Sequence, residues 1–84
     1  MLVKFNFNKV LTRTLVSSEI HRMYREAVKN FVIEHRRYIR YYKFKRRQVQ
    51  ILFSDNVNIE QVIIRFKEVV GLLGYVITST VVNI

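Results

Sequence analysis

Polar and hydrophobic residues alternate in two short segments of the chain. Residues 3–7 alternate valine and phenylalanine with lysine and asparagine, and residues 47–53 repeat the pattern with glutamines at polar positions. This period of two is typical of a strand with one buried face. Residues 75–82 are rich in valine, isoleucine and threonine, which predicts a further strand. Residues 10–16 are expected to form a hairpin with the first strand, although no glycine stands at the turn.

From Ser17 onward the pattern has the period of a helix. Ser17 and Ser18 are typical N-terminal caps. At about 100° per residue, the hydrophobic residues of this segment gather on one wide face and seven cations gather on a stripe beside it. We therefore expect a long basic helix over about 18–44. The seven cations of this stripe are Arg22, Arg25, Lys29, Arg36, Arg40, Lys43 and Arg47.

A second interpretation ends this helix near His35. Residues 38–44 then form a strand that pairs with residues 47–53, in the strand-helix-strand-strand-helix-strand order of a ferredoxin-like domain. The turn at Lys45 and Arg46 lacks the glycine, asparagine or aspartate that a tight hairpin favours. We therefore prefer the long helix and keep the ferredoxin-like order as the alternative.

A shorter helix is expected over about 58–73. Asn58 is a typical N-cap, with Gln61 as its reciprocal partner three residues on. Hydrophobic residues at spacings of three and four give this helix one apolar face. Gly74 is placed to cap its C-terminus.

These elements predict one small, basic α+β domain over residues 1–84. A mixed sheet of three to five strands is expected to pack against the long basic helix and the shorter one. Residues 47–82 form a strand-helix-strand unit, so its two strands should run parallel.

Composition narrows the class of protein. The chain has 84 residues, no cysteine and no proline, and 50% of its residues are hydrophobic. The lack of cysteine excludes disulfides and thiolate zinc sites, and it fits a reducing compartment such as the cytoplasm. Its start lacks the pattern of a secretory signal. The longest uncharged run, residues 69–84, is shorter than the about 20 residues of a membrane-spanning helix, so we expect no transmembrane segment.

The net charge of +9 is unevenly distributed. Residues 36–47 contain seven basic and no acidic residues, interleaved with aromatic ones. Surface helices usually mix signs, because like charges on one face repel, so the stripe predicts a polyanionic partner rather than a merely solvated face. Lysine and arginine contact the phosphates of DNA or RNA. The candidate nucleic-acid contacts are Arg22, Arg25, Lys29, Arg36, Arg37, Arg40, Lys43, Lys45, Arg46 and Arg47.

Aromatic residues in this stretch are candidates for stacking on unpaired bases. Tyr41 and Phe44 suit this role, whereas Tyr38 and Tyr42 lie on the apolar face of the predicted helix and are expected in the core. The two histidines lack further ligands at suitable spacing, so we expect them to be structural and predict no metal site. No motif indicates a cofactor or a catalytic group.

These features favour a non-enzymatic protein that binds DNA or RNA through phosphates, with low sequence specificity. One alternative is an interaction module that docks on an acidic protein or an anionic membrane surface. Another is a small metal-free ribonuclease of the toxin type, with His35, Arg37, Tyr41 and Lys45 as the nearest candidates. A homodimer is expected, because the apolar face of the long helix is wider than one small sheet covers.

Overall fold

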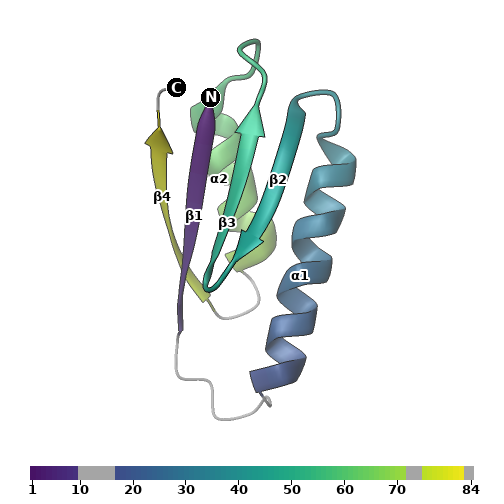
Figure 1. The fold of residues 1–84 in the computed structure, drawn as a ribbon, viewed down its shortest axis with the longest axis vertical. Helices are drawn as coiled ribbons and strands as arrows, with labels where there is room; N and C mark the ends of the chain where they lie inside the picture. Colours follow the sequence, from purple (N-terminus) through teal and green to yellow (C-terminus); the bar gives the residue numbers. More distant parts are fainter. Residues whose placement is uncertain (10–16, 72–74, 83–84) are drawn as a thin grey trace.

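The computed structural model describes residues 1–9, 17–71 and 75–82. Its elements follow the order strand-helix-strand-strand-helix-strand (Figure 1). They are β1 (Leu2–Lys9), α1 (Ser17–Glu34), β2 (Ile39–Lys45), β3 (Gln48–Phe53), α2 (Ile59–Gly71) and β4 (Tyr75–Val82). The protein is therefore a small α+β domain, as predicted. The strand expected over residues 10–16 and the cap at Gly74 lie outside the described residues.

The four strands form one sheet in the order β2-β3-β1-β4. All neighbouring strands in it are antiparallel, so the expectation of a mixed sheet is wrong. β3 and β4 run in the same direction, as predicted for residues 47–82, but β1 lies between them and is antiparallel to both. The two strands of that unit are therefore not hydrogen-bonded to each other.

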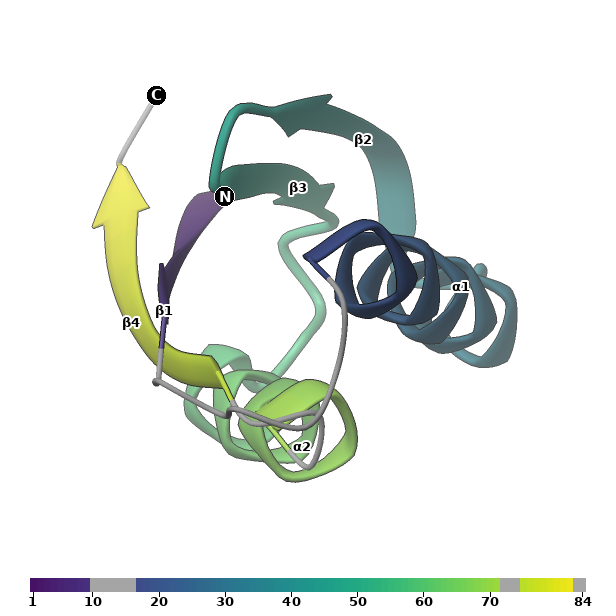
Figure 2. The ribbon, with the colours of Figure 1, turned by 90° about the horizontal axis from the view of Figure 1, so that it is seen from below.

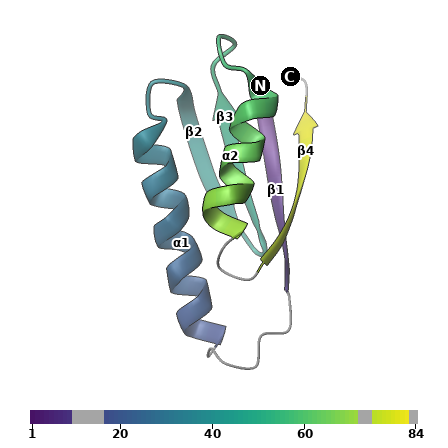
Figure 3. The same ribbon diagram turned by 180° about the vertical axis from the view of Figure 1, so that it is seen from behind.

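Both helices lie on the same face of the curved sheet (Figures 2 and 3). The buried residues of β1 and β3 beneath them are Val3, Phe5, Phe7, Val49, Ile51 and Phe53. Phe66 of α2 stacks on Phe5 with ring centroids 3.8 Å apart, and it meets Phe31 of α1 edge-on at 5.0 Å. This aromatic centre joins both helices to the sheet. No helix among the described residues covers the opposite face.

Helix α1 ends at Glu34, so the predicted long helix is wrong in its second half. The amides of Tyr38 and Ile39 both donate to the carbonyl oxygen of His35, at 2.9 and 3.2 Å, and turn the chain there. The following segment forms β2, because its aromatic and β-branched side chains suit a strand and its backbone gains hydrogen-bond partners along β3. Pairing with the next strand along the chain thus overrides the local helical period.

A tight turn at Arg46 and Arg47 connects β2 to β3. Arg47 takes the left-handed backbone conformation, with a φ of 56°, at a position where a hairpin usually has glycine or asparagine. Its carbonyl oxygen accepts a hydrogen bond of 2.9 Å from the amide of Phe7 in β1. This bond helps to hold the strained residue in place, which explains a hairpin that the turn residues alone disfavour.

We expect Arg47→Gly to raise the free energy of unfolding by about 1 kcal/mol, because glycine adopts a left-handed conformation without the roughly 1–2 kcal/mol that other residues lose there. Arg46→Gly is the matched control. It removes the same charge at a residue that lacks a positive φ, so its added backbone freedom should lower stability. Urea denaturation measures the free energy of unfolding of both variants. Equal changes in the two would contradict the left-handed conformation of Arg47.

Helix α2 begins with the predicted cap. The backbone carbonyl oxygen of Asn58 accepts a hydrogen bond of 3.1 Å from the backbone amide of Val62. Its side-chain oxygen Oδ1 accepts one of 3.3 Å from the backbone amide of Gln61. Asn58 thereby satisfies amides of the first turn, which have no partner within the helix itself. Neither α2 nor any other helix in the described ranges is long and apolar enough to cross a membrane.

Candidate nucleic-acid interface

The structure divides the candidate cations among three places, and the side chains of all ten are exposed. They are Arg22, Arg25 and Lys29 on α1, Arg36 and Arg37 in the α1–β2 turn, and Arg40, Lys43, Lys45, Arg46 and Arg47 on β2 and its hairpin turn. The prediction that seven of them share one helix face is therefore wrong, because α1 ends at Glu34 and the cations after it stand in turns and on β2.

The ten cations nevertheless lie along one border of the molecule, which we name the basic edge. β2 is the outermost strand on its side of the sheet, and α1 lies beside it in both views (Figures 1 and 3). The guanidinium carbon of Arg25 lies 5.2 Å from the centroid of the Phe44 ring, which ties α1 to β2. Tyr24 meets the same ring edge-on at 5.8 Å. Arg25 of α1 therefore lies beside the helix-covered face of β2, and Lys43 and Lys45 lie on the other face of the same edge strand, so the basic edge includes both sides of β2.

Among the described residues, no carboxylate pairs with a cation of the basic edge. In the part of the chain that the structure describes, ion pairs join the Met1 amino group to Asp55 at 3.9 Å and Arg65 to Glu68 at 3.6 Å. Neither pair includes one of the ten cations. Because unpaired like charges repel one another, a polyanion bound along this edge would relieve the repulsion.

The uncovered face of the sheet, which we name the open face, adjoins the basic edge. The strand register arranges its side chains in rows that cross all four strands. One row is Lys45, Gln48, Asn6 and Thr78, the next is Lys43, Gln50, Lys4 and Thr80, and the third is Tyr41, Leu52, Leu2 and Val82. The first two rows are polar throughout, so this part of the face suits a hydrated, negatively charged ligand.

Side-chain amides connect the two polar rows. Nε2 of Gln48 donates to Oδ1 of Asn6 at 2.8 Å, and Nε2 of Gln50 donates to Oε1 of Gln48 at 2.9 Å. These bonds orient three amides across β1 and β3. Each amide has more donor and acceptor sites than these bonds use, and such groups can contact base edges.

A groove of about 590 Å³ joins the open face to the hairpin turn. Its lining residues are Asn6, Phe7, Asn8, Arg46, Arg47 and Thr78. The two arginines therefore lie beside neutral amide and hydroxyl groups. Arginine is well suited to phosphate oxygens because its planar guanidinium offers two parallel donors. The groove is the place where the basic edge and the open face meet.

The predicted stacking residues lie on different faces of β2. Tyr41 lies on the open face and is 50% exposed. Phe44 lies on the helix-covered face, where its ring contacts Tyr42 and Arg25, so only Tyr41 remains available for stacking on a base. Tyr38 and Tyr42 were expected in the core, but they are 42% and 38% exposed, because Tyr38 stands in the turn before β2 and Tyr42 on the edge strand itself.

The four residues named for a ribonuclease are not brought together. Arg37 precedes β2 and Lys45 ends it, which separates them by about 20 Å at about 3.3 Å per residue. Nδ1 of His35 is bonded to the carbonyl oxygen of Phe31 at 2.9 Å. Among the described residues, no group of three or more histidine, aspartate or glutamate side chains is placed to hold a metal ion.

Sequence reasoning from the clustered charge missed the part of this surface that lies on β1 and β3. Lys4, Asn6, Gln48 and Gln50 stand at the polar positions of the two alternating segments, which were used only to predict strands. The signal was therefore present, since the polar positions of a half-buried strand identify the face that no helix covers. Their neighbours in β4 carry no comparable signal.

The structure also reduces the apolar surface on which a homodimer was expected. Tyr24, Val28 and Phe31 of α1 are buried in the core of the same chain. Tyr38, Ile39 and Tyr42, which made the predicted face so wide, do not belong to α1. The apolar face left on α1 is therefore narrower than the one from which a homodimer was expected.

Comparison with known proteins does not identify the chain. No protein family, curated protein or solved structure matches it. Its function must therefore be inferred from the charges and side chains of the surfaces described above.

Proposed function

We propose that this chain is a non-enzymatic nucleic-acid-binding protein that holds DNA or RNA against its basic edge and open face. The observation that carries the proposal is the junction of the two surfaces, because Lys43 and Lys45 belong to both. Exposed cations without carboxylate partners thereby adjoin an uncovered sheet face of lysine, amide and hydroxyl groups. A phosphate backbone with bases attached is complementary to this combination.

Phosphate contacts supply most of the proposed affinity. The seven residues of β2 extend over about 20 Å at about 3.3 Å per residue, between cations of the α1–β2 turn and of the hairpin turn. One strand of a duplex has a phosphate every 3.4 Å or so, which places about six phosphates within that length. Several simultaneous contacts are therefore sterically reasonable, and they carry no sequence information.

Base contacts have a smaller part in the proposal. The open face offers one exposed aromatic ring, that of Tyr41, and the amides of Asn6, Gln48 and Gln50. A single ring and a few amides discriminate weakly among bases. Low sequence specificity is the consequence.

We expect Tyr41→Ala to lower the affinity for single strands about tenfold and to change duplex affinity less, because stacking on an unpaired base contributes about 1–3 kcal/mol. Tyr41→Phe retains the ring and should bind like the wild type. Fluorescence anisotropy at one fixed salt concentration compares the three proteins. A similar loss in Tyr41→Phe would assign the effect to the hydroxyl group and contradict stacking.

A salt series tests the proposal as a whole. Fluorescence anisotropy is measured with labelled single-stranded and duplex DNA and RNA. The logarithm of affinity should fall linearly with the logarithm of salt concentration, with a slope of about 0.9 per phosphate contacted on duplex DNA and about 0.7 on single strands. Failure to bind any of the four ligands at low salt would overturn the proposal and leave an acidic protein or an anionic membrane as the partner.

A further inference from the structure

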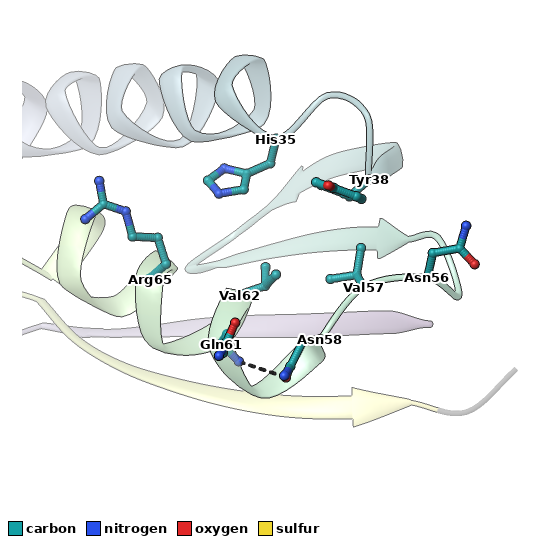
Figure 4. A pocket seen from close by; sticks show the side chains of 8 residues that line it. All are labelled: His35, Tyr38, Asn56, Val57, Asn58, Gln61, Val62 and Arg65. Atoms are coloured by element: carbon teal, nitrogen blue, oxygen red, sulfur yellow. Dashed lines mark hydrogen bonds between the residues drawn. The ribbon is translucent and has the colours of Figure 1, made fainter.

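A cleft of about 520 Å³ separates the end of α1 from the start of α2, on the helix side of the sheet (Figure 4). Its volume is within the range of small-ligand pockets, roughly 300–1,000 Å³. His35 and Tyr38 line one side, and Val57 and Val62 line the side across from them. Phosphate contacts along the basic edge leave this cleft unused.

His35 presents a positioned ring to the cleft. The imidazole stacks on Phe31 with ring centroids 4.2 Å apart. Because a carbonyl oxygen only accepts, Nδ1 donates the proton in its 2.9 Å bond to Phe31. Nε2 is therefore the ring nitrogen left for a ligand. Tyr38 adds a second ring, which is 42% exposed.

Amides and one guanidinium supply the polar groups of the cleft. Asn58 caps α2, Gln61 stands in its first turn, and Arg65 follows one turn later (Figure 4). Arg65 lies 3.6 Å from Glu68, but both side chains are more than half exposed, so a phosphate can replace this carboxylate. Among the described residues that line the cleft there is no acidic side chain.

The cleft combines aromatic rings, valines, amides and a cation. This combination is complementary to one class of ligand. A nucleobase is planar, stacks on aromatic rings and has donors and acceptors on its edge. Its attached phosphate requires a cation. A metal ion would require carboxylates, and a purely apolar ligand would leave the amides without partners.

We propose that this cleft receives one unpaired nucleotide of the bound strand. The base lies against Tyr38 and His35, and the phosphate meets Arg65. Arg36 and Arg37, which belong to the basic edge, stand between the two aromatic residues in the chain, so the cleft adjoins one end of that edge. The inference rests on the proposed function and adds a ligand class, a strand with at least one base outside a duplex.

The first test compares wild type, Tyr38→Ala and Tyr38→Phe in binding to an eight-nucleotide single strand of thymidylate and to a duplex of the same length. Tyr38→Ala should lose about tenfold in affinity for the single strand and keep its duplex affinity within about twofold, whereas Tyr38→Phe should bind like the wild type. Thermal melting confirms that each variant is folded. Equal effects on both ligands, or none on either, would overturn the inference.

A second measurement uses wild-type protein alone. An abasic strand with the same eight phosphates should bind about tenfold or more weakly than the thymidylate strand, and thymidine monophosphate should compete only at far higher concentration. Equal affinity for the abasic strand would overturn the cleft as a base site, and stacking on Tyr41 with it, while leaving the phosphate contacts of the proposed function intact. If thymidine monophosphate bound as tightly as the thymidylate strand, the inference that the cleft receives a nucleotide of a bound strand would be overturned. Absence of binding to every strand and duplex would instead overturn the proposed function.

Discussion

Replacing Lys43, Lys45 and Arg46 together with alanine is expected to lower the affinity for nucleic acid roughly ten- to a hundredfold at low salt. These exposed residues stand where the basic edge meets the open face. An exposed ion pair contributes up to about 1 kcal/mol, so three lost contacts amount to about 1.5–3 kcal/mol. Each lost phosphate contact also reduces the salt dependence, so the slope should fall by about 2–3.

The free energy of unfolding should not fall in this triple variant. None of the three side chains takes part in an ion pair among the described residues, and their removal reduces repulsion between like charges. The matched single variants are Lys43→Ala and Lys67→Ala, because Lys67 is an exposed lysine on α2, away from the basic edge. Comparable losses of affinity in both single variants would show that net charge matters and the basic edge does not.

Phe66→Ala is expected to lower the free energy of unfolding by about 3–5 kcal/mol, which is the usual range for removing a fully buried aromatic ring. Phe66 has 0% exposure, and its ring lies between those of Phe5 and Phe31 at 3.8 and 5.0 Å. A domain of this size has a total stability of about 4–13 kcal/mol, at roughly 0.05–0.15 kcal/mol per residue. The substitution therefore removes a large part of the stability and leaves a measurable unfolded fraction.

Urea denaturation of Phe66→Ala beside Ile64→Ala isolates the effect of the aromatic centre. Ile64 stands on the same helix and is 57% exposed, so its truncation should change stability by less than about 0.5 kcal/mol. A loss below about 1 kcal/mol for Phe66→Ala would contradict the packing of α2 on the sheet. Together with the triple variant, these proteins separate loss of fold from loss of charge.

The sequence predicted those elements whose local pattern agrees with their tertiary setting. β4 covers Tyr75–Val82 as expected, and α2 begins after Asn58 with the expected cap. In both segments the hydrophobic period, the turn residues and the position of the core point to the same structure. Local reasoning is sufficient where these signals coincide.

Only the alternative interpretation, with a strand over residues 38–44, predicts β2, and the preferred long helix misses it for an identifiable reason. The register shifts between Ile39 and Tyr41, so the residues that face the helices, Ile39, Tyr42 and Phe44, do not alternate in the sequence. A bulge of this kind hides the period of two and leaves a spacing that resembles a helix. The hairpin turn was also hard to predict, because Arg47 takes a left-handed conformation that an arginine in the sequence does not indicate.

The candidate interface was predictable in its charges and not in its geometry. Clustered cations identified the residues, but only the pairing of β2 with β3 places Lys43 and Lys45 in rows with the amides of Gln50 and Gln48. Those rows join segments about forty residues apart in the chain, as Asn6 and Gln48 illustrate. No local pattern contains that information.

Backbone amide chemical shifts during titration with a single-stranded oligonucleotide test the central proposal most directly. The largest shifts are expected at Lys4, Lys43, Gln50 and the hairpin turn, and the exposed side of α2 around Lys67 should stay unchanged. Shifts confined to α2, or uniformly small shifts at saturating ligand, would contradict an interface formed by the basic edge and the open face.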